Sequence, residues 1–158
     1  MQASILYQEE FCLTPSLWAG RSNTLPAMRF LVDTVVWLWS VGEVGRLNQA
    51  AREVLTDPQH ELYFSAASVW EIAIKASLGR LQLSGPPRVV VPRETARQGL
   101  RPLPISYLHA LAVYDLPLHH GDPFDRLLVA QARSEGLTLI TADRELKQYP
   151  VELFWAGR

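Results

Sequence analysis

Short apolar runs alternate with longer stretches of helical periodicity along this chain from Met28 onward, and this alternation constrains the fold more than any other feature. The apolar runs are rich in Val, Ile, Leu and Phe, as buried strands are, whereas the stretches between them space their apolar residues as helices do. Such a pattern is typical of βαβ units, in which a helix connects two parallel strands. We therefore predict an α/β fold with a mostly parallel central sheet flanked by helices.

The individual elements can be placed from this pattern. The predicted strands are Arg29–Val32, Glu61–Ser65, Arg101–Ile105, Thr138–Thr141 and Val151–Phe154. The predicted helices are Val35–Ser40, Leu47–Thr56, Ala66–Leu78, Pro92–Gln98, Ser106–Val113, Pro123–Ser134 and Asp143–Gln148. The clearest internal break is Ser84-Gly85-Pro86-Pro87, but neither flanking half is long enough for a core of its own, so we predict a surface loop within a single domain.

The first 27 residues differ from the rest of the chain. They show neither strand nor helix periodicity and are punctuated by Pro and Gly, so we predict an irregular extension over 1–27, a domain over 28–158, and Met28 as the functional start. The segment lacks the basic and apolar regions of a secretory signal, and no stretch of the chain approaches the length of a membrane span. We expect a protein that is neither secreted nor embedded in a membrane.

Composition narrows the function classes. Of 158 residues 48% are hydrophobic, which excludes a disordered chain, and the 15 Lys and Arg nearly balance the 16 Asp and Glu. No global basic field therefore exists, so any contact with nucleic acid must be local. A single cysteine, Cys12, cannot form an internal disulfide and fits a reducing compartment. We expect a cytoplasmic protein.

Four acidic residues are placed where ligands of a parallel sheet gather, beyond the carboxyl ends of the strands. Asp33 ends the first predicted strand and Asp143 follows the fourth. Glu71 lies on an apolar helix after the second strand, where a carboxylate needs a partner. Asp125 lies in the first turn of a helix, whose positive end favours an anion. The four carboxylates can therefore converge from four elements.

Converging carboxylates repel one another, and a hard divalent cation such as Mg²⁺ or Mn²⁺ relieves that repulsion. Ions of this kind activate water and stabilise the leaving oxygen when a phosphodiester is hydrolysed. The chemistry that the four residues imply together is that of a nuclease.

Taken singly, each carboxylate also has a structural interpretation. The one that ends the first strand suits a turn, and Glu71 can pair with Lys75 one helical turn later. Asp122 is predicted to be the N-cap of the helix that begins at Pro123, with Asp125 as a capping-box partner. The carboxylate after the fourth strand suits a helix cap as well. Only the joint placement of the four favours a metal site.

The remaining candidate ligands and stacking residues are less informative. His119 and His120 are adjacent, so they cannot easily point at one ion, and we do not predict a zinc site. Tryptophans within apolar stretches are predicted to pack in the core: Trp37, Trp39 and Trp70. The roles of Trp18 and Trp155 stay open.

Four blocks of sequence occur along the chain in this order: FLVDTVVWLW, SVWEIAIKASLGRL, HHGDPFDRLLVAQA and LTLITADREL. Together they resemble PIN-domain proteins and, more narrowly, VapC-type toxins of bacterial toxin–antitoxin pairs. The resemblance runs from about Met28 to the C-terminus. It implies a single PIN-like domain, and its acidic quartet falls on the residues singled out above: Asp33, Glu71, Asp125 and Asp143.

Further residues follow from the same resemblance. Thr141 matches a hydroxyl position that helps to hold water or a carboxylate at the metal, with an ordinary strand-end Thr as the alternative. Ser65 and Ser68 are candidate hydrogen-bond donors behind the site, although capping is the simpler role for Ser65. Arg126 is predicted either to contact phosphate or to pair with Asp122.

Two positions depart from the family pattern. Val35 stands where many relatives carry His, and Gly121 stands where Arg commonly precedes DPFD. Neither change removes a carboxylate, so they affect the expected substrate preference and leave the expected metal site in place.

The function implied by the resemblance is that of a Mg²⁺- or Mn²⁺-dependent endoribonuclease, the toxin of a type II toxin–antitoxin pair. It also implies an RNA substrate, a cognate antitoxin protein and a homodimer. Three alternatives stay open: a PIN nuclease of RNA processing or DNA repair, a non-catalytic interaction module, and an enzyme that uses Asp33 as a phosphotransfer nucleophile. The last is disfavoured because Val35 stands where such enzymes carry a second acid.

Overall fold

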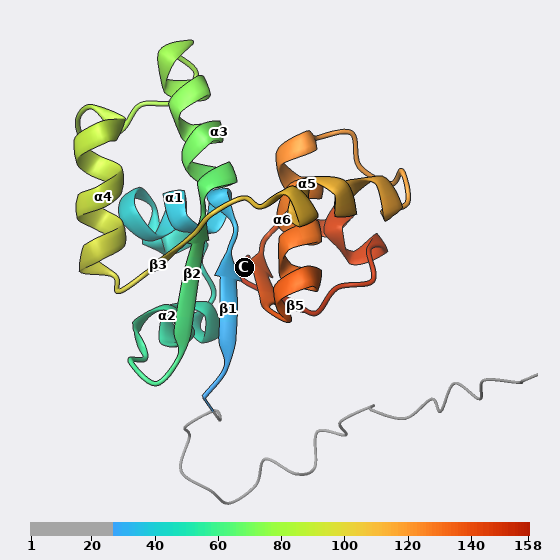
Figure 1. The fold of residues 1–158 in the computed structure, drawn as a ribbon. Helices are drawn as coiled ribbons and strands as arrows, with labels where there is room; N and C mark the ends of the chain where they lie inside the picture. Colours follow the sequence, from blue (N-terminus) through green and yellow to red (C-terminus); the bar gives the residue numbers. More distant parts are fainter. Residues whose placement is uncertain (1–26) are drawn as a thin grey trace, which may run out of the picture.

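Five parallel strands form one central sheet in the order β3-β2-β1-β4-β5 in this computed structural model, which describes residues 27–158 (Figure 1). The strands are β1 (Arg29–Val32), β2 (Glu61–Ser65), β3 (Arg101–Leu103), β4 (Thr138–Thr141) and β5 (Leu153–Trp155). The α-helices are α1 (Thr34–Gly42), α2 (Gln49–Thr56), α3 (Ala66–Ser77), α4 (Pro87–Arg97), α5 (Tyr107–Ala112) and α6 (Pro123–Glu135). Short 3₁₀ helices are η2 (Val44–Arg46), η3 (Val113–Asp115) and η4 (Arg144–Gln148). The predicted α/β class with a parallel sheet is confirmed, whereas the predicted extension over 1–27 lies almost wholly outside the described residues.

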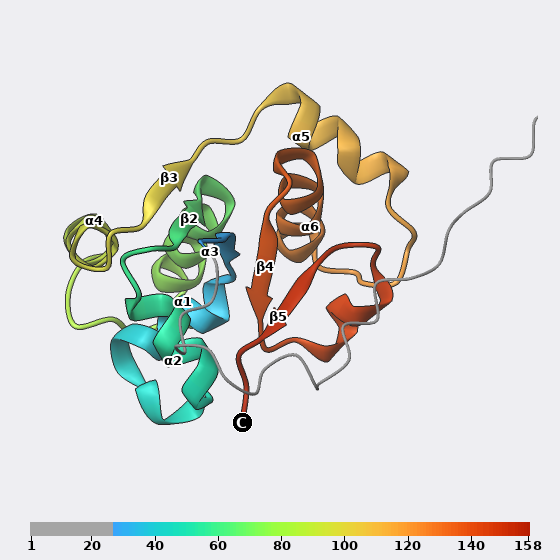
Figure 2. The ribbon, with the colours of Figure 1, turned by 90° about the horizontal axis from the view of Figure 1, so that it is seen from below.

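Both faces of the sheet are covered, as a parallel sheet requires. Phe30 and Val32 of β1 point into one cluster with Trp37 of α1, whereas Leu31 points into a second cluster with Leu128 of α6. Figures 1 and 2 show α1, α2 and α4 gathered on one side, and α5 and α6 on the other. The alternation of side chains along β1 therefore serves two cores at once.

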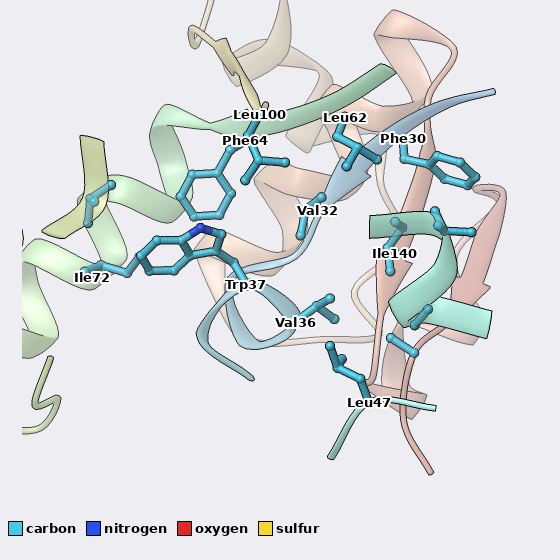
Figure 3. Close-up of a cluster of buried hydrophobic side chains, with 14 residues drawn as sticks. Phe30, Val32, Val36, Trp37, Leu47, Leu62, Phe64, Ile72, Leu100 and Ile140 are labelled. Carbon is cyan, nitrogen blue, oxygen red and sulfur yellow. The ribbon is translucent and has the colours of Figure 1, made fainter. Parts of the chain in front are cut away.

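The first cluster is built around a buried tryptophan. The ring of Trp37 lies 5.1 Å from that of Phe64 in β2, and Ile72 of α3 completes the group (Figure 3). All three side chains are at most 3% exposed. Burial of this kind contributes roughly 1.5–3 kcal/mol per large side chain, so it fixes α1 and α3 against the ends of the strands.

The strand register determines where the polar residues at the sheet edge lie. Val32, the last residue of β1, is paired with Phe64 in β2 and with Ile140 in β4. The residues that follow in the three strands therefore reach the same edge together: Asp33, Ser65 and Thr141. Polar residues from three separate parts of the sequence are brought side by side.

Most predicted elements are confirmed within a residue or two, and the largest difference is in α4. We predicted a helix over Pro92–Gln98. The helix instead begins at Pro87, in the first turn where a missing N–H costs little, and continues through Pro92. The carbonyl that Pro92 leaves without its helical bond belongs to Arg88, an exposed residue. The last residue of the predicted loop at 84–87 is therefore the first residue of α4.

Smaller differences occur at the ends of other elements. The strand predicted to reach Ile105 ends at Leu103, and β5 lies one to two residues later than predicted. The stretch Asp143–Gln148, predicted as a helix, forms the 3₁₀ helix η4, and the helix predicted over Ser106–Val113 is divided into α5 and η3. Among residues 27–158, no helix has both the length and the apolar character needed to cross a membrane.

Candidate active site

Asp33 and Thr141 form the buried part of the polar edge. Asp33 caps the N-terminus of α1 but makes no side-chain capping bond, so its carboxylate is available elsewhere. The hydroxyl of Thr141 donates a 2.7 Å hydrogen bond to Oδ2 of Asp33, and both residues are at most 2% exposed. The Thr141 hydroxyl also accepts a bond of 3.0 Å from the backbone N–H of Asp143. One hydroxyl thus ties the ends of β1 and β4 together.

Glu71 enters the site from α3. Ser65 caps this helix by accepting from the N–H of Ala67, as predicted, and Glu71 lies buried about two turns later. Lys75 pairs with Oε1 of Glu71, so the helix-pair interpretation is also confirmed. The other oxygen, Oε2, is buried without a hydrogen-bond partner in the described part of the chain. The pair with Lys75 therefore leaves one carboxylate oxygen unsatisfied.

The N-terminus of α6 supplies Asp125. Asp122 is the N-cap, as predicted: its Oδ1 accepts from the N–H groups of Phe124 and Asp125 at 2.8 and 3.5 Å. The carboxylate of Asp125 itself faces His120, with Oδ2 3.3 Å from Nε2, rather than turning back to the helix backbone. Because Asp122 performs the capping, Asp125 is free to face the site.

Asp143 and His120 complete the arrangement. Oδ1 of Asp143 accepts from the N–H of Glu145 at 2.9 Å, which caps η4 as predicted. Oδ2 of Asp143 lies 3.1 Å from Nε2 of His120, and the same Nε2 lies 3.1 Å from Oε2 of Glu145. Three carboxylates therefore surround one ring nitrogen of His120.

His120 is the site residue that sequence reasoning missed. The two histidines were set aside together because adjacent side chains diverge, and they do: His119 packs edge-on against Tyr149, 5.5 Å away, while His120 turns to the carboxylates. The backbone N–H of Asp122 donates a 2.9 Å hydrogen bond to Nδ1 of His120. Because Nδ1 accepts, the neutral ring carries its hydrogen on Nε2, which can donate to Oδ2 of Asp143. The one sequence feature that could have indicated His120 is its position just before the helix that carries Asp125.

The carboxylates act on one another through their charges. Burial raises the pKa of Asp33 to about 6, the bond from Thr141 opposes this, and the charges of Glu71 and Asp143 add to it. Burial also raises the pKa of Asp125 to about 7, helped by the charge of Asp33 and opposed by His120. Both carboxyls therefore lie in a negative, poorly hydrated environment that a cation would relieve.

The predicted residues are brought together to different degrees. His120, Asp125 and Asp143 offer ligand atoms that all lie within 4.8 Å of one another. Asp33 and Glu71 stand outside that tightest group and interact with it through their charges. Of the four predicted carboxylates, Asp125 and Asp143 are therefore direct neighbours, and Asp33 and Glu71 are buried groups whose charges act on them.

Two further predictions are wrong. Arg126 neither faces the site nor pairs with Asp122. It is buried, and its guanidinium donates to the carbonyls of Pro117, Val113 and Leu116 and to the hydroxyl of Tyr149. Five donors on a rigid fork suit an arginine to satisfying loop carbonyls, so Arg126 fixes the loop before α6.

Trp70 is not a core residue. Its side chain is 58% exposed and its ring packs edge-on against Phe124, 5.1 Å away. The helix α3 is apolar on more sides than it buries, so composition alone could not indicate which face meets the sheet.

Comparison with known proteins agrees with this architecture. The sequence profile described as the PIN domain matches residues 30–152. The chain belongs to the PIN-domain family. Among curated PIN relatives, Ribonuclease VapC22 of Mycobacterium tuberculosis is 33% identical over 120 residues, covering 75% of this chain and 90% of that protein. Ribonuclease VapC16 of the same organism is 30% identical over 95 residues, covering 60% and 67%.

Solved PIN structures share the fold. VapBC2 from Rickettsia felis, bound to a DNA fragment from its promoter, gives a TM-score of 0.62 at 15% identity, covering 81% of this chain and 98% of the matched chain. DNA-bound VapBC from Salmonella typhimurium gives 0.60 at 18% identity, with the same coverage. At these identities, the similarity shows a shared fold only.

Proposed function

We propose that this PIN domain is a metal-dependent endoribonuclease, the toxin of a type II toxin–antitoxin pair. The observation that carries the proposal is the gathering of Asp33, Asp125 and Asp143 at one sheet edge, where burial and mutual charge raise two of their pKa values. The curated relatives are named as VapC ribonucleases, which supports RNA as the substrate class. We take residues 28–158 as the catalytic domain, in keeping with the profile match over 30–152.

The residues present fit a divalent ion such as Mg²⁺ or Mn²⁺. The unpartnered Oε2 of Glu71 is a buried polar atom of the kind that needs an unseen partner, and carboxylate oxygen is the ligand that these ions prefer. The residues that we propose as ligands are Asp33, Glu71, Asp125 and Asp143. When bound, such an ion lowers the pKa of water and offsets the charge of the phosphodiester.

The chain's own residues then set the geometry. Thr141 holds the carboxylate of Asp33 against the end of β4, and Lys75 fixes one oxygen of Glu71 so that the other faces the site. His120 donates from Nε2 to Asp143 and lies 3.3 Å from the carboxylate of Asp125, with its ring held by the N–H of Asp122. Because each carboxylate is held by a partner outside the quartet, little reorganisation is needed during the reaction.

A toxin of this kind needs a partner that restrains it, and we propose a cognate antitoxin protein. The solved relatives described above are complexes named VapBC, which supports this pairing. Because it would act on cellular RNA, we propose that the protein works in the cytoplasm.

We further propose a homodimer, supported by an apolar surface on α5 and the segment that follows it. Its residues, each between 67% and 92% exposed, are Tyr107, Leu108, Leu111, Tyr114 and Leu118. Several large apolar side chains exposed along one short segment favour an interaction site.

The proposal is tested with the purified chain and a labelled single-stranded RNA. We expect cleavage in Mn²⁺ or Mg²⁺, none in excess EDTA, and none with Asp125→Asn, which keeps the shape of the side chain but removes its charge. Recovery of activity when Mn²⁺ is restored after EDTA distinguishes metal dependence from loss of fold. Equal cleavage by the Asp125→Asn variant would show that the quartet is not the site. No cleavage by the parent under any of these conditions would favour a non-catalytic interaction module.

A further inference from the structure

A pocket of about 530 Å³ lies beside the candidate active site, at the carboxyl ends of β4 and β5. It is lined by Trp39, Gly45, Arg46, Ala142, Arg144, Trp155, Gly157 and Arg158. Ala142 and Arg144 directly flank Asp143 in the sequence, so the wall of the pocket adjoins one of the proposed metal ligands. The pocket and the carboxylates therefore share one edge of the sheet, where ligands of parallel sheets bind.

Two tryptophans form the aromatic part of this pocket, and a cation lies over each. The guanidinium of Arg46 lies 4.3 Å from the ring centre of Trp39. Nζ of Lys147 lies 4.9 Å from the ring centre of Trp155, and the guanidinium of Arg144 lies 6.0 Å from it. Both tryptophans are only partly buried, so aromatic and positively charged side chains lie together at this pocket.

Gly157 fixes the position of one of these rings. A Cβ atom at Gly157 would lie 3.1 Å from the Trp155 ring, closer than such atoms normally approach. The absence of a side chain therefore lets the backbone lie against one part of the ring, and the antiparallel bridge between Leu47 and Gly157 holds that backbone in place. Trp155 is thus supported from behind and is not a loose surface side chain.

The charge of the pocket contrasts with that of the whole chain. The net charge is −1, yet four basic side chains gather here: Arg46, Arg144, Lys147 and Arg158. Glu43 pairs with Arg46 at 3.4 Å, at an exposed position where an ion pair is weak. The nearby carboxylates of Asp143 and Glu145 are turned toward His120. The pocket is therefore locally basic, which is what a near-neutral chain requires of any site that contacts nucleic acid.

We propose that this pocket binds an unpaired nucleotide of the RNA substrate, with its base stacked on Trp155 in place of the Lys147 ammonium and the adjoining phosphates held by Arg46 and Arg144. This inference rests on the proposed function and deepens it by naming single-stranded RNA as the substrate form. Proteins that bind single strands combine aromatic stacking surfaces with a basic track in this way. Paired bases in a duplex are stacked on one another and cannot enter such a pocket.

Binding is measured in the full-length Asp125→Asn chain, so that RNA is not consumed, by fluorescence anisotropy of a labelled single-stranded 12-mer of mixed sequence. We expect Trp155→Ala to weaken binding about tenfold or more and Trp155→Phe to retain most of it, because stacking requires only an aromatic face. Arg144→Ala is expected to weaken binding several-fold and to reduce the slope of log affinity against log salt by about one. Arg133→Ala, which removes an exposed cation from α6, is the matched control and should change neither quantity.

Circular dichroism and thermal unfolding identify any variant that has lost its fold, and the exposed Arg144 keeps the test decisive if Trp155→Ala is unstable. The proposal is overturned if the folded Trp155→Ala and Arg144→Ala variants bind the single strand as tightly as the Asp125→Asn parent does. It is also overturned if a duplex of the same sequence binds that parent as tightly as the single strand does. Its failure is distinguishable from failure of the proposed function. Cleavage by the native chain together with unchanged binding by both variants would overturn the pocket alone. No cleavage together with weakened binding by both variants would support the pocket and count against the nuclease.

Discussion

The hydroxyl of Thr141 donates a hydrogen bond of 2.7 Å to Oδ2 of Asp33, across a sheet edge where both side chains are buried. The two residues are separated by 108 positions in the sequence and meet because β1 and β4 are neighbours in parallel register. The bond opposes the effect of burial, which raises the pKa of Asp33 to about 6. Thr141 therefore helps to keep a buried carboxylate ionised, which is the form that binds a cation.

Replacing Thr141 by Val should weaken the binding of Mn²⁺, because it removes the bond and leaves Asp33 harder to ionise. Hydrogen bonds to charged groups contribute about 1.5–3 kcal/mol, which corresponds to a loss of roughly ten- to hundredfold in affinity. Thr141→Ser keeps the hydroxyl and should bind nearly as the parent does. Isothermal titration at neutral pH is the measurement, and equal affinity for the Val and Ser variants would contradict the role given to Thr141.

Asp125→Asn should stabilise the metal-free protein at neutral pH. The folded-state pKa of Asp125 is raised to about 7 from 3.8, so its carboxyl favours folding when protonated, below the unfolded value, and loses that contribution as pH rises through about 7. The free energy of unfolding of the variant should therefore exceed that of the parent by an amount that grows from near zero at pH 4 to on the order of 2–4 kcal/mol at pH 8. Urea unfolding in EDTA across this range measures it.

A bound divalent ion should reverse the order of stability of the parent and the Asp125→Asn variant. A divalent ion binds the ionised carboxylates and so stabilises the parent at pH 8 far more than at pH 5. The variant serves as the control, since it lacks one proposed ligand. A variant that is no more stable than the parent at pH 8 in EDTA would be evidence that Asp125 is not held in a negative, poorly hydrated environment.

His120 should carry its hydrogen on Nε2 in the metal-free protein. The N–H of Asp122 donates to Nδ1, and Nε2 faces the carboxylates of Asp125, Asp143 and Glu145 at 3.1–3.3 Å. Two-bond ¹H–¹⁵N correlation spectra of the imidazole ring report this tautomer directly. An Nδ1–H tautomer would mean that Nε2 presents a lone pair to the site, and His120 would then be a candidate ligand in place of a hydrogen-bond donor.

The apolar surface of α5 predicts a dimer that one charge can disrupt. Leu108 is 75% exposed, and Leu108→Asp should shift the protein from dimer to monomer in sedimentation velocity at micromolar concentration. Leu78→Asp makes the same change at the end of α3, where the leucine is 58% exposed, and should leave the dimer intact. A parent that sediments as a monomer would rule out the proposed pairing.

Local patterns predict the residues whose role follows from the strand in which they lie. Asp33 and Asp143 could be placed because each follows an apolar run, and parallel strands bring such ends to one edge, whereas Thr141 became a candidate only through the family resemblance. Asp122 and Ser65 could be assigned as caps because the Asp-Pro and strand–Ser–helix patterns have local physical causes.

Residues whose role depends on packing between distant segments could not be predicted in this way. His120 faces the carboxylates only because the loop before α6 is fixed, and Arg126 fixes that loop by donating to its carbonyls. The pocket at Trp39 and Trp155 depends likewise on contact between η2 and the C-terminal segment. Neither arrangement has a periodicity that a single sequence reveals.

The central claim is tested most directly by inducing the chain in bacteria and following growth together with the integrity of total RNA, beside the Asp125→Asn variant at matched expression. The account predicts growth arrest and discrete RNA fragments for the parent, and neither for the variant. Intact RNA and normal growth with soluble, folded parent protein would contradict the assignment as a ribonuclease toxin.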